Sequence, residues 1–187
     1  MINLRYIKGK PKEKEVEDLQ TADQLVRDGK LPDYQANLYW IMRYTGAHVS
    51  EAAGIRFEDI DLENECLHIR DNEMRPLKTS YRPRVIPAIP ELLAVLKKVK
   101  IRETGHVFPG LYNERYQRWG NGMSWHRTIG HSPKACRDSV ATELRDADVN
   151  ERTLGAILGH TPKTSTGRYG AVSQEAKLAA LMHLSQS

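Results

Sequence analysis

Residues 134–170 read KACRDSVATELRDADVNERTLGAILGHTPKTSTGRYG, and this stretch decides the fold more than any other part of the chain. Its apolar residues recur at helical spacing, which predicts one helix at about 133–147 and a second at about 150–158. A short helix is expected to follow and to reach Tyr169, and Ser173 is a suitable N-cap for a last helix. The C-terminal third of the chain is therefore expected to be helical.

Four side chains in the same stretch suit a phosphate ligand. Lys134 and Arg137 lie three residues apart on the first predicted helix, so they share one face. His160 follows the end of the second helix, and Tyr169 lies nine residues beyond it. Arginine can bind two phosphoryl oxygens at once. A tyrosine near such cations ionises below its reference pKa of about 10 and can then attack phosphorus.

The preceding part of the chain mixes helical and extended patterns. Apolar residues have helical spacing between Pro32 and Gly46, whereas residues 65–70 read as a strand. Residues 75–90 contain two extended pieces around a polar turn, and their prolines indicate the edge of a sheet. The remaining features are a short helix capped by Ser50, an amphipathic helix opened by Pro90 and a largely irregular segment at 101–130. Together these patterns predict an α+β fold, mostly α-helical with one small antiparallel sheet or hairpin.

The composition is that of a globular chain with a modest basic surplus. The 187 residues include 28 Lys and Arg against 24 Asp and Glu, so the formal net charge is +4. This surplus only weakly favours a polyanionic partner. The two cysteines, Cys66 and Cys136, form no disulfide framework and no C-x-x-C pair, so neither a metal site nor a cofactor is expected. No apolar run approaches the roughly 20 residues that span a bilayer, and a cytoplasmic protein without membrane contact is expected.

Four blocks of the sequence resemble, in order, the motifs of one family. TGAHVSEAAGIRFEDIDLE at 45–63 resembles T-G-x-R-x-S-E-x-x-x-L-x-W-x-D-I-D, and KTSYRPRVIP at 78–87 resembles a hairpin that carries a lysine. KACRDSVATEL at 134–144 resembles H-x-x-R-H-T-F-A-T-x-L, and LGHTPKTSTGRYG at 158–170 resembles L-G-H-x-x-x-x-T-x-x-Y. From about 32 to about 184, the chain thus resembles the catalytic domain of the tyrosine recombinases, the phage integrase family. The type IB topoisomerases are relatives of this fold.

The resemblance implies a role for each matching residue. Tyr169 is at the position of the nucleophile, which takes up the 3′ phosphate of a cleaved strand and releases a 5′ hydroxyl. Arg137 is at the position of the second family arginine, which clamps the scissile phosphate and stabilises the transition state. His160 is at the position of the late histidine, which donates a hydrogen bond to the phosphate near the nucleophile. The implied activity is that of a site-specific DNA recombinase or integrase.

Lys78 lies in the predicted hairpin, where the resemblance implies a general acid toward the leaving 5′ oxygen. A flexible ammonium at a hairpin tip beside DNA suits that role. A competing interpretation makes Lys78 an ordinary turn lysine. In that case Arg75, Arg82 and Arg84 would only follow the DNA backbone.

Two positions depart from the family pattern. Lys134 stands where the family usually has histidine, but it remains a donor to phosphate. His48 stands where the first catalytic arginine is expected, although Glu51 still matches the acidic residue three positions later. Losing one transition-state donor costs about 10²–10³ in rate. Three explanations stay open: a natural weakening, a substitution made to silence the site, or another cation, for which Arg43 is a candidate, that covers the phosphate.

The same resemblance gives expectations for domains and partners. Residues 1–31 are expected to form a basic arm or linker with the start of the domain, and residues 32–187 the catalytic domain. Family recombinases carry an N-terminal helical core-binding domain that this chain lacks, so a fragment is expected. The partners implied are double-stranded DNA and further copies of the chain in a synaptic tetramer on DNA, with a monomer allowed when DNA is absent. A bacterial or phage-encoded protein, nucleoid-associated when bound, fits this description.

Two other classes of function are weighed against the recombinase. A cleavage-defective DNA-binding module on the same scaffold is the main alternative, and His48 is the residue that favours it. A metal nuclease is disfavoured because no Asp, Glu and His cluster has ligand spacing in the sequence. His126 and His131 are five residues apart, which does not align them on one helix.

Overall fold

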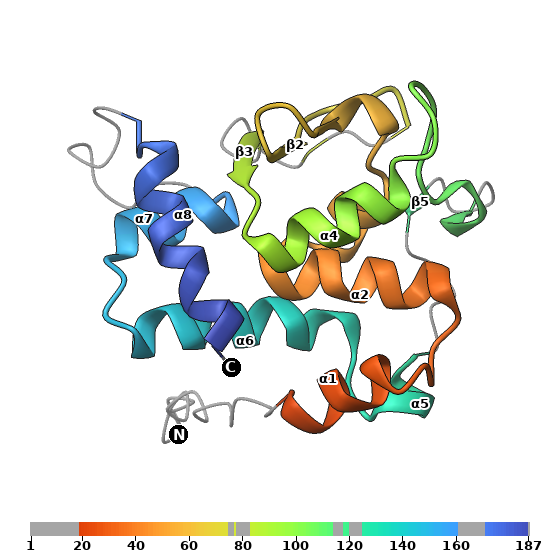
Figure 1. The fold of residues 1–187 in the computed structure, drawn as a ribbon, viewed down its shortest axis with the longest axis horizontal. Helices are drawn as coiled ribbons and strands as arrows, with labels where there is room; N and C mark the ends of the chain where they lie inside the picture. Colours follow the sequence, from red (N-terminus) through yellow and green to blue (C-terminus); the bar gives the residue numbers. More distant parts are fainter. Residues whose placement is uncertain are drawn as a thin grey trace, which may run out of the picture.

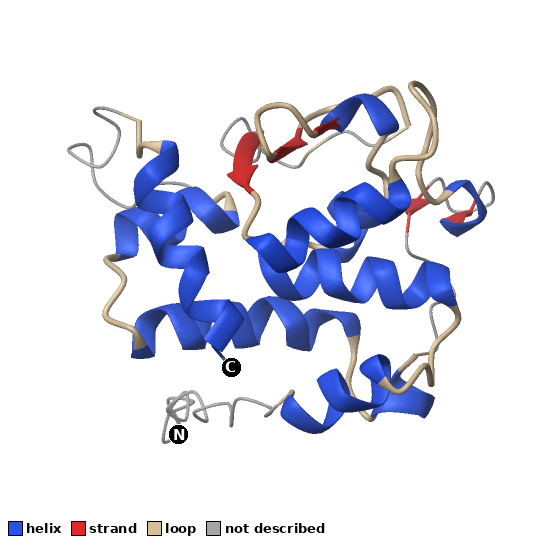
Figure 2. Cartoon of the chain, in the orientation of Figure 1, coloured by secondary structure: helices blue, strands red, loops and turns tan. Residues whose placement is uncertain are grey.

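The computed structural model of the chain describes residues 19–74, 77, 83–113, 118–119, 125–160 and 171–186. The α-helices in these ranges are α1 (Gln20–Arg27), α2 (Asp33–Thr45), α3 (Val49–Ala53), α4 (Pro90–Val99), α5 (His126–Ile129), α6 (Pro133–Asp146), α7 (Glu151–Leu158) and α8 (Gln174–Leu181). The strands are β1 (Ile60–Asp61), β2 (Cys66–Ile69), β3 (Arg84–Pro87), β4 (Tyr112–Asn113) and β5 (Arg118–Trp119). Short 3-10 turns are η1 (Phe57–Asp59), η2 (Pro109–Leu111) and η4 (Met182–Gln186). Helices clearly dominate and the strands are short, so the predicted fold class is confirmed (Figure 2).

Helix α2 lies at the centre of the molecule, between α6 on one side and α4 on the other (Figure 1). The expected helix between Pro32 and Gly46 is confirmed, and its residues Leu38 and Ile41 are fully buried. Pro90 opens α4 as expected, because proline suits the first turn of a helix. The core of the chain therefore forms around a helix that its apolar spacing predicts.

The small sheet of β1, β2 and β3 has that strand order, and both pairings are antiparallel. In the described residues β4 and β5 form a second antiparallel pair, so the prediction of one sheet was incomplete. Leu67 of β2 lies opposite Ile86 of β3, and both side chains are fully buried against the helices. The strand expected at 65–70 is confirmed, and β3 lies at an edge of the sheet, as its prolines indicate. The predicted hairpin tip, with Lys78, lies outside the described residues.

Helix α1 was not among the predicted elements, although it packs firmly on the core. Its residues Ala22, Asp23 and Val26 are buried. The Tyr39 hydroxyl donates to Asp23 at 2.5 Å, and Arg43 forms ion pairs with Asp23 at 3.2 Å and with Glu143 at 3.0 Å. These contacts join α1, α2 and α6 through buried polar groups.

The C-terminal helix α8 lies against α7 and β3 of the same chain. Ser173 caps it as expected, because its Oγ accepts a hydrogen bond from the Ala176 amide at 3.1 Å. Leu181 is buried in the core, whereas Leu178 and Met182 are exposed. The helix expected to reach Tyr169 lies outside the described residues. Among the helices that the structure describes, none is long and apolar enough to cross a membrane.

Gly46 ends α2 in the left-handed conformation, with φ of 61°. A Cβ atom here would lie 2.5 Å from Leu158 Cδ2 and 3.1 Å from Val140 Cγ1. We expect Gly46→Ala to lower the free energy of unfolding by about 2–4 kcal/mol, from left-handed strain and overpacking together. Urea denaturation measures the loss.

Gly29 provides the matched control for Gly46→Ala. It also has a positive φ, of 73°, but a Cβ atom there would meet no atom within 4 Å. Gly29→Ala is therefore expected to cost only the conformational part, about 1–2 kcal/mol. Equal losses in free energy of unfolding for Gly46→Ala and Gly29→Ala would show that the close approach of Leu158 to position 46 adds nothing to the cost.

Candidate active site

Arg137 lies at the centre of the candidate site and joins the ends of two other helices. It projects from α6 and is half-buried. Its Nη1 donates to the Gly46 carbonyl at 2.7 Å, and its Nη2 donates to the Leu158 carbonyl at 2.7 Å. Gly46 caps α2 and Leu158 is the last residue of α7, so both acceptors lie at helix C-termini, where the helix dipole is negative. One guanidinium therefore positions two segments that carry family motifs.

His160 lies directly beside this guanidinium. Gly159 ends α7 in the left-handed conformation, with φ of 70°, and the His160 amide then donates to the Gly155 carbonyl at 2.9 Å. The Nε2 atom of His160 is 3.0 Å from Arg137 Nη2. A guanidinium has no acceptor, so Nε2 accepts and the neutral ring carries its proton on Nδ1. The His160 side chain is exposed beside the Arg137 guanidinium.

His48 has a structural role that the sequence did not indicate. The sequence predicts Ser50 as the N-cap of α3, but that prediction is wrong, because His48 occupies the cap position. Its Nδ1 accepts from the Ser50 amide at 3.4 Å and lies 3.1 Å from Ser50 Oγ. The His48 amide in turn donates to Glu51 Oε2 at 2.9 Å. An arginine has no acceptor with which to make this cap.

A buried ion pair lies beneath the His48 backbone. Glu51 Oε2, which accepts from the His48 amide, also accepts from Arg84 Nη2 at 2.8 Å. Arg84 Nε donates to the carbonyl of Ile157 in α7 at 2.7 Å. The Glu51 and Arg84 side chains are only 2% and 4% exposed. The interpretation of Arg84 as a residue that follows the DNA backbone is therefore wrong, because its guanidinium is committed inside the protein.

The two other cations that the sequence analysis considered, Lys134 and Arg43, are each paired with carboxylates. Lys134 is exposed in the first turn of α6, and its ammonium pairs with Asp138 at 2.6 Å. Arg43 was a candidate to cover the phosphate in place of an arginine at position 48. That candidate is wrong, because Arg43 is buried between α1 and α6 in its pairs with Asp23 and Glu143.

Lys78 and Tyr169 both lie outside the described residues, so their predicted roles stay predictions. Within the described ranges, the structure brings Arg137 and His160 together, and Arg137 also binds the Gly46 carbonyl, two residues before His48. Gly46 and Arg84 are site-forming residues that sequence reasoning missed. The available signal was that Arg84 begins an otherwise apolar strand, Arg84–Pro87, which indicates that its guanidinium has a buried acidic partner.

The chain is similar in sequence to one family model and to several curated recombinases. The model of the phage integrase family matches residues 12–176. The tyrosine recombinase XerD of Mycobacterium tuberculosis is 27% identical over 162 residues, covering 80% of this chain and 51% of the recombinase. XerD of Bifidobacterium longum is 31% identical over 152 residues, covering 72% of this chain and 48% of the recombinase. The chain thus spans about half the length of the curated relatives it matches.

Solved structures share the fold at lower sequence identity. The integrase from mycobacterium phage Brujita has a TM-score of 0.68 at 20% identity, covering 95% of this chain and 61% of the integrase. The Tn1549 transposon integrase, solved in complex with transposon right end DNA, has a TM-score of 0.63 at 17% identity. That match covers 96% of this chain and 69% of the integrase. Because the family model covers most of the sequence, the chain belongs to the phage integrase family of tyrosine recombinases.

Proposed function

We propose that the chain is the catalytic domain of a site-specific DNA recombinase, which cleaves and rejoins strands through a phosphotyrosine at Tyr169. The observation that supports this most is the position of Arg137. Its guanidinium is held between the C-terminal carbonyls of α2 and α7, beside the exposed imidazole of His160. A phosphate that reaches this edge would meet a cation and a neutral N–H donor in fixed positions.

The proposed reaction needs no metal and no cofactor. Tyr169 loses its phenolic proton to solvent, and its phenolate oxygen attacks the scissile phosphorus and forms a 3′-phosphotyrosine, while the bond from phosphorus to the 5′ oxygen breaks. Lys78 gives a proton to that oxygen, which leaves as a 5′ hydroxyl. Arg137 and His160 stabilise the charge on the phosphoryl oxygens during the transfer. Attack by a 5′ hydroxyl on the phosphotyrosine reverses these steps and rejoins the strand.

The substrate proposed is double-stranded DNA, and the active assembly is a tetramer of chains on two duplexes. The net charge of +4 and the match to an integrase solved with DNA support the nucleic-acid partner. We further propose that residues 32–187 form the catalytic domain and that 1–31 are a basic arm or linker that includes its start. The packing of α1 on the core supports the second part of this proposal. Bacterial recombinases among the relatives support a cytoplasmic location near the nucleoid.

A cleavage-defective DNA-binding module is the second candidate, and His48 favours it. The imidazole at this position caps α3 through Nδ1, so at most its Nε2 can donate to a phosphate. One donor in place of a guanidinium fork would weaken transition-state stabilisation. This candidate predicts DNA retention with a steep dependence on salt and no covalent product.

Covalent capture distinguishes the two candidates. The protein is incubated with a pool of nicked duplexes of randomised sequence, so that a cleaved fragment diffuses away and the phosphotyrosine accumulates. We expect a protein–DNA adduct that survives denaturing electrophoresis and is absent in Tyr169→Phe. The Tyr112→Phe variant, altered at a half-buried tyrosine of β4, serves as the matched control. DNA binding without an adduct, in both this protein and His48→Arg, would overturn the proposed cleavage.

A further inference from the structure

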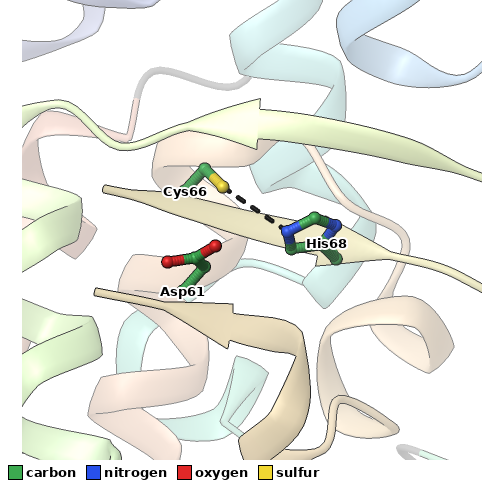
Figure 3. Close-up of side chains that lie close together, drawn as sticks. All are labelled: Asp61, Cys66 and His68. Atoms are coloured by element: carbon green, nitrogen blue, oxygen red, sulfur yellow. Dashed lines mark hydrogen bonds between the residues drawn. The ribbon is translucent and has the colours of Figure 1, made fainter. Parts of the chain in front are cut away.

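Three side chains with metal-binding chemistry gather on the small sheet, at a place that the proposed reaction does not use. They are Asp61 of β1 and Cys66 and His68 of β2 (Figure 3). Asp61 lies directly opposite Cys66 in the antiparallel pairing, and His68 is two residues further along the strand. Alternate residues of a strand project from the same face, so the thiol, imidazole and carboxylate meet there. Their ligand atoms all lie within 4.8 Å of one another.

The spacing of sulfur and nitrogen fits a tetrahedral metal. Cys66 Sγ and His68 Nε2 are 3.5 Å apart. Zinc–sulfur and zinc–nitrogen bonds of usual length, at a tetrahedral angle, place these two atoms about 3.5–3.6 Å apart. One ion could therefore bridge the two side chains with little change in either.

Two hydrogen bonds from Asn64 already orient the carboxylate of Asp61. Its Oδ1 accepts from the Asn64 amide at 2.9 Å, and its Oδ2 accepts from Asn64 Nδ2 at 2.8 Å. A carboxylate has about four lone-pair sites, so both oxygens keep the capacity to bind an ion. Metal ligands are commonly oriented by hydrogen bonds of this kind from a neighbouring residue.

We propose that Asp61, Cys66 and His68 bind a divalent ion of the zinc class. A thiolate with an imidazole favours Zn²⁺ or Co²⁺ over Mg²⁺ or Ca²⁺, which prefer oxygen ligands only. Binding replaces the thiol proton of Cys66, which passes to solvent, and water completes the four ligands. The ion would tie β1 to β2 across their connecting turn. This proposal is independent of the proposed function, because none of the three residues belongs to the candidate active site.

The competing interpretation is a plain hydrogen bond between the Cys66 thiol and the His68 ring, with no affinity for an ion. Cobalt distinguishes the two, because a thiolate bound to Co²⁺ gives a charge-transfer band in the near ultraviolet. We expect this band to saturate at one Co²⁺ per chain and to disappear when Zn²⁺ displaces the probe. The second free cysteine, Cys136, lies outside this cluster, so the two thiols can be compared in the same assay.

Cys136 supplies the matched control. It lies in α6, is 1% exposed, and burial raises the pKa of its thiol to about 12. We expect Cys66→Ser to abolish the Co²⁺ band and Cys136→Ser to keep it. In a Zn²⁺ titration, Cys66→Ser and His68→Gln are each expected to weaken binding at least tenfold, and Asn64→Ala about 10–100-fold. Circular dichroism checks that each variant remains folded.

Asp61→Asn gives a further test at a partly exposed position, where folding is least at risk. It keeps the oxygen but removes the charge, and Zn²⁺ affinity is expected to fall. Absence of the band in this protein would overturn the proposal, as would a band that survives Cys66→Ser or is lost only in Cys136→Ser. Unchanged Zn²⁺ affinity in both Cys66→Ser and His68→Gln would do the same.

Discussion

Replacing His48 with arginine is expected to raise the rate of DNA strand cleavage by about 10²–10³, the range that one transition-state donor contributes. Position 48 lies two residues beyond the carbonyl that binds Arg137, so a guanidinium there would face the same phosphate. The gain comes with a loss, because His48 Nδ1 caps α3 and arginine cannot. We expect the free energy of unfolding to fall by about 1 kcal/mol, as for other lost caps.

The measurement for His48→Arg is single-turnover cleavage at saturating protein, so that tighter DNA binding does not enter the rate. His48→Lys is the matched control, since it adds the charge without the fork. Its gain is expected to be smaller than that of arginine. His48→Ala should lose the cap and gain no activity. An unchanged rate in His48→Arg would show that position 48 does not contact the scissile phosphate.

Breaking the buried pair of Glu51 and Arg84 is expected to lower the free energy of unfolding by about 3–5 kcal/mol, because an uncompensated charge stays inside the protein. Both Glu51→Gln and Arg84→Met would do this, since each side chain is almost completely buried. The double variant is expected to lose less than the sum of the two single losses. Urea unfolding of the unaltered protein, the two single variants and the double variant gives the coupling free energy between Glu51 and Arg84.

An exposed pair supplies the control for this cycle. Arg145 Nε lies 2.8 Å from Glu151 Oε1, and the two side chains are 49% and 68% exposed. Glu151→Gln is expected to cost less than about 1 kcal/mol. If Arg84→Met fails to fold, Arg84→Lys keeps the charge and removes only the guanidinium fork, and its loss is expected to be smaller than that of Glu51→Gln. Additive losses at Glu51 and Arg84 would contradict a direct interaction.

The main helices and the sheet could be predicted because their burial follows a local period. The segment that became α2 has apolar residues at helical spacing. In β2, Leu67 and Ile69 share one fully buried face, as the strand period predicts. Helix α1 was missed although Leu19, Ala22 and Val26 have helical spacing and are buried. It differs from the predicted helices in burying a charged side chain, Asp23, whose partners come from α2.

For the candidate site, the sequence predicted the residue types better than their contacts. Arg137 and His160 lie in short motifs, so their resemblance to the family could be recognised without a structure. Arg84 could not be assigned, because its partners depend on how β3 packs on α3 and α7. The grouping of Asp61 with Cys66 and His68 was missed for a similar reason, since it depends on the register of β1 and β2.

The double attachment of Arg137 to Gly46 and Leu158 also affects how the protein would bind phosphate. A free arginine side chain samples many rotamers, and immobilising it costs roughly 1.5–2 kcal/mol of entropy. Here that ordering takes place when the chain folds, because both carbonyls hold the guanidinium in the absence of DNA. The entropic cost is therefore part of the folding free energy, and phosphate binding at this residue need not include it.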